Sequence, residues 1–175
     1  MRNLKNGLPR TREHAYKCLI RPLLEYCGAV WDPHTINQRE ALESVQNKAV
    51  RYVVNQHRRW CKKTQRPCTS ISSWKAKLQW EPLSLRRSRS SLRCLHKALA
   101  GHPAWSDIAE AISKAPFTGK SDHAQKLYLP RYETDVGRFS FLGRSIRQWN
   151  RLPGPVMATF PKEFSSVAVL IQDLV

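Results

Sequence analysis

Acidic side chains are scarce in this chain of 175 residues. Asp and Glu together number 13 against 30 Lys and Arg, so the formal net charge is +17 at pH 7. The imbalance is concentrated between Ser44 and Ser106, where fourteen basic residues are accompanied by one acid, Glu81. Such an excess of one sign is costly in self-repulsion, and a polyanion is the partner that would relieve it. The composition therefore predicts contact with nucleic acid.

Long apolar runs are also missing. The longest purely apolar run is Val167 to Ile171, five residues, whereas a helix that spans a membrane needs about 20. The first residues, MRNLKNGLPRTREH, contain no apolar segment of the kind found in secretory signals, and the chain has no Asn-x-Ser/Thr glycosylation site. We therefore expect a cytoplasmic or nuclear protein that is neither secreted nor attached to a membrane.

Cysteines are few, odd in number and scattered, which favours reduced thiols over a disulfide framework. Cys61 and Cys68 lie near His57, but zinc sites need paired ligands at short intervals, and no second close pair is present. The sequence therefore predicts no metal site and no cofactor.

No complete catalytic motif occurs. The stretch from Phe117 to Ser121 ends like a phosphate-binding loop, but Lys114 stands where the first glycine of that loop is required. Glu133 and Asp135 lack the further carboxylates that two-metal catalysis needs. We therefore expect a protein that is not an enzyme.

Helical periodicity dominates what is present. Residues 11–30 and 36–55 carry apolar side chains at steps of three and four, and Pro22 is expected to kink the first of these helices. The predicted apolar face of the first helix is Ala15, Cys18, Leu19, Leu23, Tyr26, Cys27 and Val30, and that of the second is Ile36, Leu42, Val45, Ala49, Tyr52 and Val53.

A third predicted helix, at residues 83–100, is apolar on one face and basic on another. Its apolar stripe is Leu85, Leu92, Leu95 and Leu99, and its basic stripe is Arg86, Arg89, Arg93 and Lys97. The basic stripe is suited to tracking a phosphate backbone; the alternative is an ordinary solvated helix face. Gly101 is expected to cap this helix.

A polar connection is predicted at residues 56–73. Its Arg58, Arg59, Lys62 and Lys63 are further candidates for nucleic-acid contact. Trp60 among them either stacks on a base or, as we favour, packs against its own domain.

The remaining signals are weaker. They predict short helices at 105–113 and 143–150, one β-hairpin within 126–142 and a terminal helix at 161–174. The expected fold class is thus mainly α with at most one small β-hairpin. Its core would pair the first two helices with the third and bury Leu42, Val45, Leu92, Leu95 and Leu99.

Four blocks of the sequence share their order and approximate spacing with a known protein region. They are AYKCLIRPLLEYCGAVWDPH (15–34), ALESVQNKAVRYVV (41–54), LQWEPLSLRRSRSSLRCLHKALAG (78–101) and GRFSFLGRSIRQWNRLP (137–153). Together they resemble the region that follows the polymerase palm in reverse transcriptases of LINE-type non-LTR retrotransposons, the kind abundant in arthropod genomes. Residues 55–75 depart most from that pattern.

The resemblance implies a helical, thumb-like region at 1–113 that includes the basic helix, followed by a C-terminal extension at 114–175 with the hairpin and the terminal helix. It implies contact with template RNA and primer, as RNA or an RNA/DNA hybrid. The catalytic palm of the parent RNA-directed DNA polymerase would precede Met1, so the chain would be a truncated copy. The alternative is an inert or reused transposon fragment that acts only through protein contacts.

Overall fold

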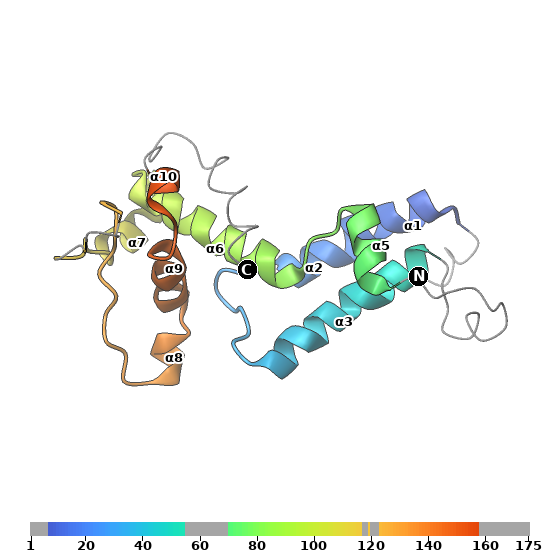
Figure 1. The fold of residues 1–175 in the computed structure, drawn as a ribbon, viewed down its shortest axis with the longest axis horizontal. Helices are drawn as coiled ribbons and strands as arrows, with labels where there is room; N and C mark the ends of the chain where they lie inside the picture. Colours follow the sequence, from blue (N-terminus) through green and yellow to red (C-terminus); the bar gives the residue numbers. More distant parts are fainter. Residues whose placement is uncertain (1–6, 55–69, 117–118, 120–122, 158–175) are drawn as a thin grey trace. The chain divides into compact units, whose positions relative to one another are not determined.

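The structure is a computed structural model that describes residues 7–54, 70–116, 119 and 123–157. In this part the chain is mainly helical (Figure 1). The described residues contain no strand, and their one β-bridge is the isolated antiparallel pair of Lys114 and Leu127. The predicted mainly α fold class is confirmed. The predicted terminal helix at 161–174 lies outside the described residues.

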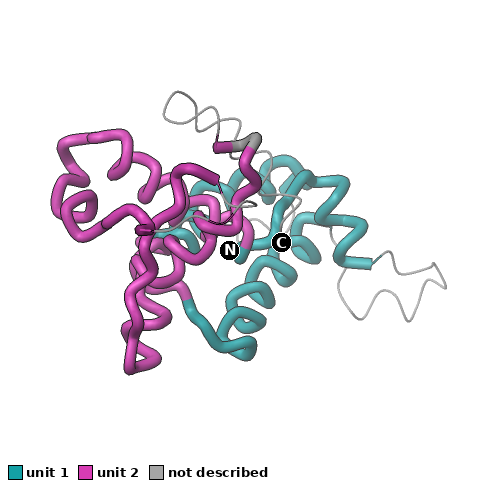
Figure 2. The backbone as a smooth tube through the Cα atoms, turned by 60° about the vertical axis from the view of Figure 1, so that its left-hand side comes forward, with its two compact units in different colours: residues 1–26, 33–84 teal, residues 27–32, 85–175 magenta. Residues whose placement is uncertain are grey.

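Two compact units make up the chain (Figure 2). Unit 1 comprises residues 1–26 and 33–84, and unit 2 comprises residues 27–32 and 85–175. The predicted boundary between residues 113 and 114 differs from this division and stays a prediction. Side chains from the C-terminal part pack on the leucines of the basic helix, so that helix belongs with the C-terminal part and not with the N-terminal helices.

In unit 1 the first predicted helix is interrupted by a wider turn. It consists of α1 (Pro9–Ala15), the π-helix η2 (Tyr16–Ile20) and α2 (Arg21–Glu25). Pro22 has no N–H to donate, and its ring would clash with the preceding turn of a regular helix. The π turn, in which the Arg21 N–H bonds the Tyr16 carbonyl, accommodates this proline.

The π turn changes which side of this segment faces inward. Tyr16 is buried, and Ile20 and Leu24 pack partly buried against the same cluster. Leu19 and Leu23 are exposed, Leu23 to 73%. The predicted apolar face is therefore wrong beyond Ala15, because the extra residue in the π turn shifts the helical register that the prediction assumed.

The core of unit 1 joins this segment to α3 (Ile36–Val53) and α5 (Ile71–Leu78). Tyr16 stacks on Trp80 with ring centroids 4.4 Å apart. The buried residues of this core are Tyr16, Ala49, Val50, Val53 and Trp80. Leu42 and Val45, predicted to be fully buried, are half-buried, because Gln46, Ala49, Val50 and Val53 form the inward side of α3.

Polar contacts close unit 1 around its core. Glu43 forms an ion pair with Lys75 and also accepts a hydrogen bond from the Leu83 N–H at 3.0 Å. The buried Gln46 donates to the Glu81 carbonyl at 2.9 Å. These bonds tie the segment that follows α5 to the middle of α3.

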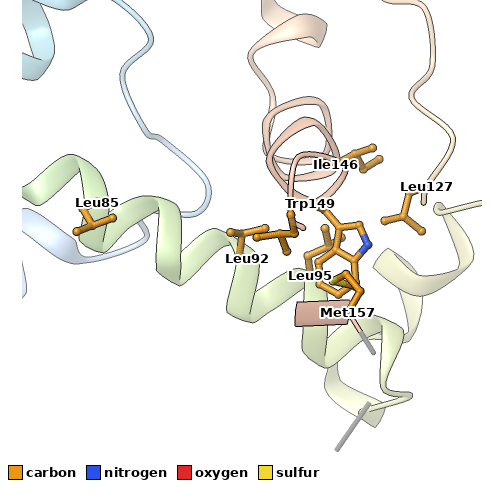
Figure 3. Close-up of a cluster of buried hydrophobic side chains, with 8 residues drawn as sticks. Leu85, Leu92, Leu95, Leu127, Ile146, Trp149 and Met157 are labelled. Atoms are coloured by element: carbon orange, nitrogen blue, oxygen red, sulfur yellow. The ribbon is translucent and has the colours of Figure 1, made fainter. Parts of the chain in front are cut away.

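Unit 2 is built on α6 (Leu83–Leu99), of which the first two residues belong to unit 1. The elements that follow are η3 (Pro103–Trp105), α7 (Ser106–Glu110), α8 (Asp135–Arg138), α9 (Phe141–Trp149) and α10 (Gly154–Met157). Figure 3 shows Leu92 and Leu95 of α6 among Leu127, Ile146 and Trp149. The predicted burial of Leu92 and Leu95 is confirmed, whereas Leu99, also predicted to be buried, is half-buried. The buried partners of Leu92 and Leu95 come from the C-terminal part of the chain and not from the N-terminal helices: Leu127, Ile146, Trp149, Leu152 and Met157.

The predicted hairpin within 126–142 is absent. The side-chain amide of Asn150 bonds the backbone of Leu127 twice. Its Oδ1 accepts from the Leu127 N–H at 2.9 Å, and its Nδ2 donates to the Leu127 carbonyl at 2.8 Å. The chain then turns into α8, whose N-terminus is capped by the Thr134 hydroxyl. A side-chain amide thus satisfies the backbone groups that a second strand would have bonded.

Candidate nucleic-acid interface

The basic helix α6 ends in a regular cap. Gly101 has a φ of +78°, in the left-handed region. The His102 N–H bonds the Lys97 carbonyl and the Gly101 N–H bonds the Ala98 carbonyl, both at 3.1 Å. This is the Schellman pattern, in which a glycine ends the helix and satisfies its last carbonyls. The end of the helix that carries Lys97 is therefore well defined.

The two sides of α6 differ sharply in burial. Leu85, Leu92 and Leu95 are buried, whereas Ser90, Arg93 and Lys97 are exposed. Arg86 and Arg89 are half-buried. The predicted basic stripe thus exists, and its accessible part is concentrated at Arg93 and Lys97.

The basic stripe, of which Arg93 and Lys97 are the exposed part, runs along most of α6. From Arg86 to Lys97 the helix rises about 16 Å at 1.5 Å per residue. The helix is anchored by its opposite face in the core of unit 2, so the stripe is carried on a rigid element. The other predicted contact residues, Arg58, Arg59, Lys62 and Lys63, lie outside the described residues, as do Cys61 and Cys68.

The half-buried Cys94 thiol lies within the influence of the two exposed cations of α6. Burial raises the pKa of the Cys94 thiol, and the positive charges of Lys97 and Arg93 partly oppose that rise. Both cations therefore act on the same half-buried position between them. A surface with this sign of potential attracts phosphate groups.

Besides the exposed and half-buried basic residues of α6, the structure contains buried ones, which the sequence analysis did not predict. Arg87 is only 2% exposed and bonds an Asp32 carboxylate oxygen at 3.2 Å. Arg144 of α9 bonds the other oxygen of Asp32 at 2.7 Å. A buried guanidinium requires such partners, because an unpaired buried charge is costly.

Arg144 is held by all three of its nitrogens. Besides Asp32, it donates from Nε to the Phe139 carbonyl and from Nη2 to the Ala29 carbonyl, each at 2.8 Å. The residues 27–32 are thereby fastened to α6 and α9 within unit 2. We call Asp32, Arg87 and Arg144 the buried ion cluster.

A signal for the buried ion cluster was present in the sequence. Arg87 falls four residues before Ser91 and eight before Leu95, so it shares the inward face of α6. The predicted basic stripe contains the neighbouring Arg86 and Arg89 but not Arg87 itself. The partner of Arg87, Asp32, lies 55 residues earlier in the chain.

Comparison of the chain with models of protein families, with curated proteins and with solved structures finds no match. Within the described ranges, no helix has both the length and the apolar character needed to cross a membrane. Among the same residues, no three His, Cys, Asp or Glu side chains gather in a group that could hold a metal ion.

Proposed function

We propose that this chain is a nucleic-acid-binding, non-catalytic fragment from the C-terminal part of a non-LTR retrotransposon reverse transcriptase. Its basic helix α6 would contact template or primer, as RNA or an RNA/DNA hybrid, while the palm of the parent polymerase would perform the chemistry. The fragment would work in the cytoplasm or the nucleus. The four sequence blocks at 15–34, 41–54, 78–101 and 137–153 carry the proposed origin.

One observation carries the binding proposal. Arg93 and Lys97 are exposed on the outer side of a helix whose inner side is fixed by Leu92 and Leu95 in the core. A solvated helix face of the ordinary kind carries both signs of charge, but the sequence has no acid between Glu81 and Asp107. Asp32 bonds the buried Arg87 on the inner side of this helix.

A salt titration tests this proposal. If four to six phosphates of a single strand are neutralised, log K falls with log salt at a slope of about −3 to −4. The double variant R93E/K97E should bind more weakly and flatten the slope by about 1.4, which corresponds to two lost phosphate contacts. The matched control is R131E/R151E, which makes the same charge change at two other exposed positions of unit 2.

The two variants separate a specific site from a general charge effect. We expect R93E/K97E to lose much more affinity than R131E/R151E while keeping the same helical content. Equal losses would mean that total charge alone governs binding. A wild-type affinity insensitive to salt would contradict the proposal.

A second candidate is a fragment that acts through protein contacts. The observation that favours it is the outer side of η2 and α2, where Leu19, Leu23 and Tyr26 are exposed at steps of four and three. Exposed apolar surface of this kind marks protein interaction sites when it is contiguous. This candidate predicts that Leu23→Ser abolishes a protein interaction and leaves the salt titration of nucleic-acid binding unchanged.

A further inference from the structure

Three serines of α6 lie close together in unit 2, in different environments. Ser88 accepts a hydrogen bond from the side-chain amide of Gln148 at 3.2 Å, and Ser91 is only 2% exposed. Ser90, between them in the sequence, is exposed. Contacts inside unit 2 therefore explain the surroundings of Ser88 and Ser91, whereas Ser90 faces solvent on the outer side of the helix.

Helix propensity does not favour a serine at position 90. The serine hydroxyl competes for backbone hydrogen bonds, so serine forms helices less readily than Ala, Lys or Glu. At an exposed position in the middle of a helix, where packing does not decide the residue, a strong helix former is the stable choice. Departures of this kind from local preference are expected where a residue serves function.

The exposed cations of α6 lie beside Ser90. Arg93 and Lys97 follow it by three and seven residues, and all three side chains are exposed. At 3.6 residues per turn, the three positions fall within about 60° around the helix axis and about 10 Å along it. The outer side of α6 thus combines a hydroxyl group with two positive charges on one narrow strip.

We propose that the Ser90 hydroxyl donates a hydrogen bond to a phosphodiester group of a nucleic-acid strand, at a site completed by the charges of Arg93 and Lys97. This proposal rests on the proposed function and deepens it, because it locates one phosphate on the helix. Serine hydroxyls commonly bond phosphate oxygens in nucleic-acid complexes, where they fix the register of the protein without reading the sequence. A hydrogen bond to a charged acceptor of this kind is stronger than one between neutral groups.

An uncharged donor has a distinctive signature in a salt titration. A cation that neutralises a phosphate releases counterions and adds to the salt slope, whereas a hydroxyl adds affinity without adding to the slope. We expect Ser90→Ala to lower the affinity for a single-stranded oligouridine by about 3- to 10-fold at every salt concentration, with an unchanged slope. Ser90→Thr keeps the hydroxyl and should retain most of the affinity.

Ser84→Ala is the matched control. Ser84 is also an exposed serine of α6, but it lies six residues before Ser90 and so about 120° away around the helix axis. We expect this variant to bind like the wild type. Equal affinities of Ser84→Ala and Ser90→Ala would overturn the proposal. Thermal melts by circular dichroism check that the variants are folded.

A charged pair of variants gives a second readout. Ser90→Glu and Ser84→Glu change the net charge by the same amount, but only the first places a carboxylate beside Arg93. We expect Ser90→Glu to weaken oligouridine binding much more than Ser84→Glu and to flatten the salt slope, because the carboxylate repels the phosphate and competes for the cations. Equal losses would mean that net charge alone acts, and the Ser90 site would be rejected.

The experiment also separates the two proposals. Wild-type binding with a steep salt slope, together with unchanged binding by Ser90→Ala, would support the basic stripe and reject the hydrogen bond from Ser90. Absence of oligouridine binding by the wild type would reject the proposed function, and the Ser90 site with it.

Discussion

Arg144 and Asp32 are joined by a 2.7 Å bond across 112 residues of sequence. The same carboxylate also bonds Arg87, and the three side chains are almost entirely removed from solvent. One acid thus compensates two buried guanidinium groups and fixes the 27–32 segment in unit 2.

Asp32→Asn should strongly destabilise unit 2. The variant removes the negative charge that bonds the buried Arg87 and Arg144. Breaking a buried pair in this way costs about 3–5 kcal/mol. Urea unfolding measures the change in the free energy of unfolding. The control is Glu133→Gln, an exposed acid in the same unit, which should change stability by less than about 0.5 kcal/mol. Equal stability of the two variants would contradict a buried ion cluster.

Leu95→Ala should cost about 2–5 kcal/mol, because it leaves a cavity in the packed core of unit 2. Leu95 is 0% exposed and lies in the cluster that contains Trp149. Leu23→Ala, at an exposed position, is the matched control and should have little effect. Denaturant midpoints of both variants decide the matter, and an unchanged midpoint for Leu95→Ala would mean that the inward face of α6 has been misassigned.

Gly143→Ala should destabilise the start of α9. A Cβ atom at this position would meet the Arg138 carbonyl oxygen at 2.8 Å and the Gly137 carbonyl oxygen at 3.0 Å, both of which are backbone atoms. Overpacking of this kind costs about 1–3 kcal/mol. Gly154→Ala is the control, because nothing lies within 4 Å of a Cβ there. A melting temperature of Gly143→Ala equal to that of the wild type would show that the backbone at Gly137 and Arg138 can move away from α9 without cost.

Stability should fall as the pH drops below about 6.5, the ordinary pKa of histidine. Burial lowers the pKa of His96 in the folded protein, so the unfolded chain binds more protons in this range. More protons on the unfolded state mean that the free energy of unfolding rises with pH, and the loss continues down to the lowered pKa. His96→Gln should remove this part of the pH dependence when unfolding midpoints are compared from pH 5 to pH 7.5. The same slope in both proteins would assign the dependence to other groups.

Sequence periodicity located most of the inward side of α6, although Leu99 is half-buried and the buried Arg87 was not predicted. The spacing of Leu92 and Leu95 gave the inward side correctly, and Gly101 marked the end of the helix. The outer side followed from the same spacing, with Arg93 and Lys97 exposed. Local pattern succeeds here because a regular helix with one register has only one way to place its apolar stripe inward.

Periodicity failed where the helical register changes. In the first segment the π turn at Tyr16–Ile20 inserts one residue, so Leu19 and Leu23 face outward and Ile20 and Leu24 face inward. A prediction that assumes 3.6 residues per turn throughout has no means of finding this shift. A distortion at Pro22 is predicted correctly, but the kind of distortion decides which residues are buried.

Long-range pairing was the second limit. Nothing near Asp32 in the sequence indicates that its partners are Arg87 and Arg144, because the contact depends on how α6 and α9 pack. Leu127 was likewise predicted to lie in a strand of a hairpin, but its backbone bonds the Asn150 side chain and not a second strand. These contacts are properties of the assembled unit, so a single sequence constrains them weakly.

The discontinuous make-up of unit 2 has a consequence for its synthesis on the ribosome. Residues 27–32 leave the ribosome early, but Arg144 is added 112 residues after Asp32. At about 5–20 residues per second, Asp32 waits roughly 6–22 s for this partner, whereas helices form within microseconds. Unit 1 needs only the residues up to Ser84, so it can fold before Arg144 is synthesised. The nascent chain therefore passes through a stage in which all residues of unit 1 have been synthesised while Asp32 still lacks Arg144.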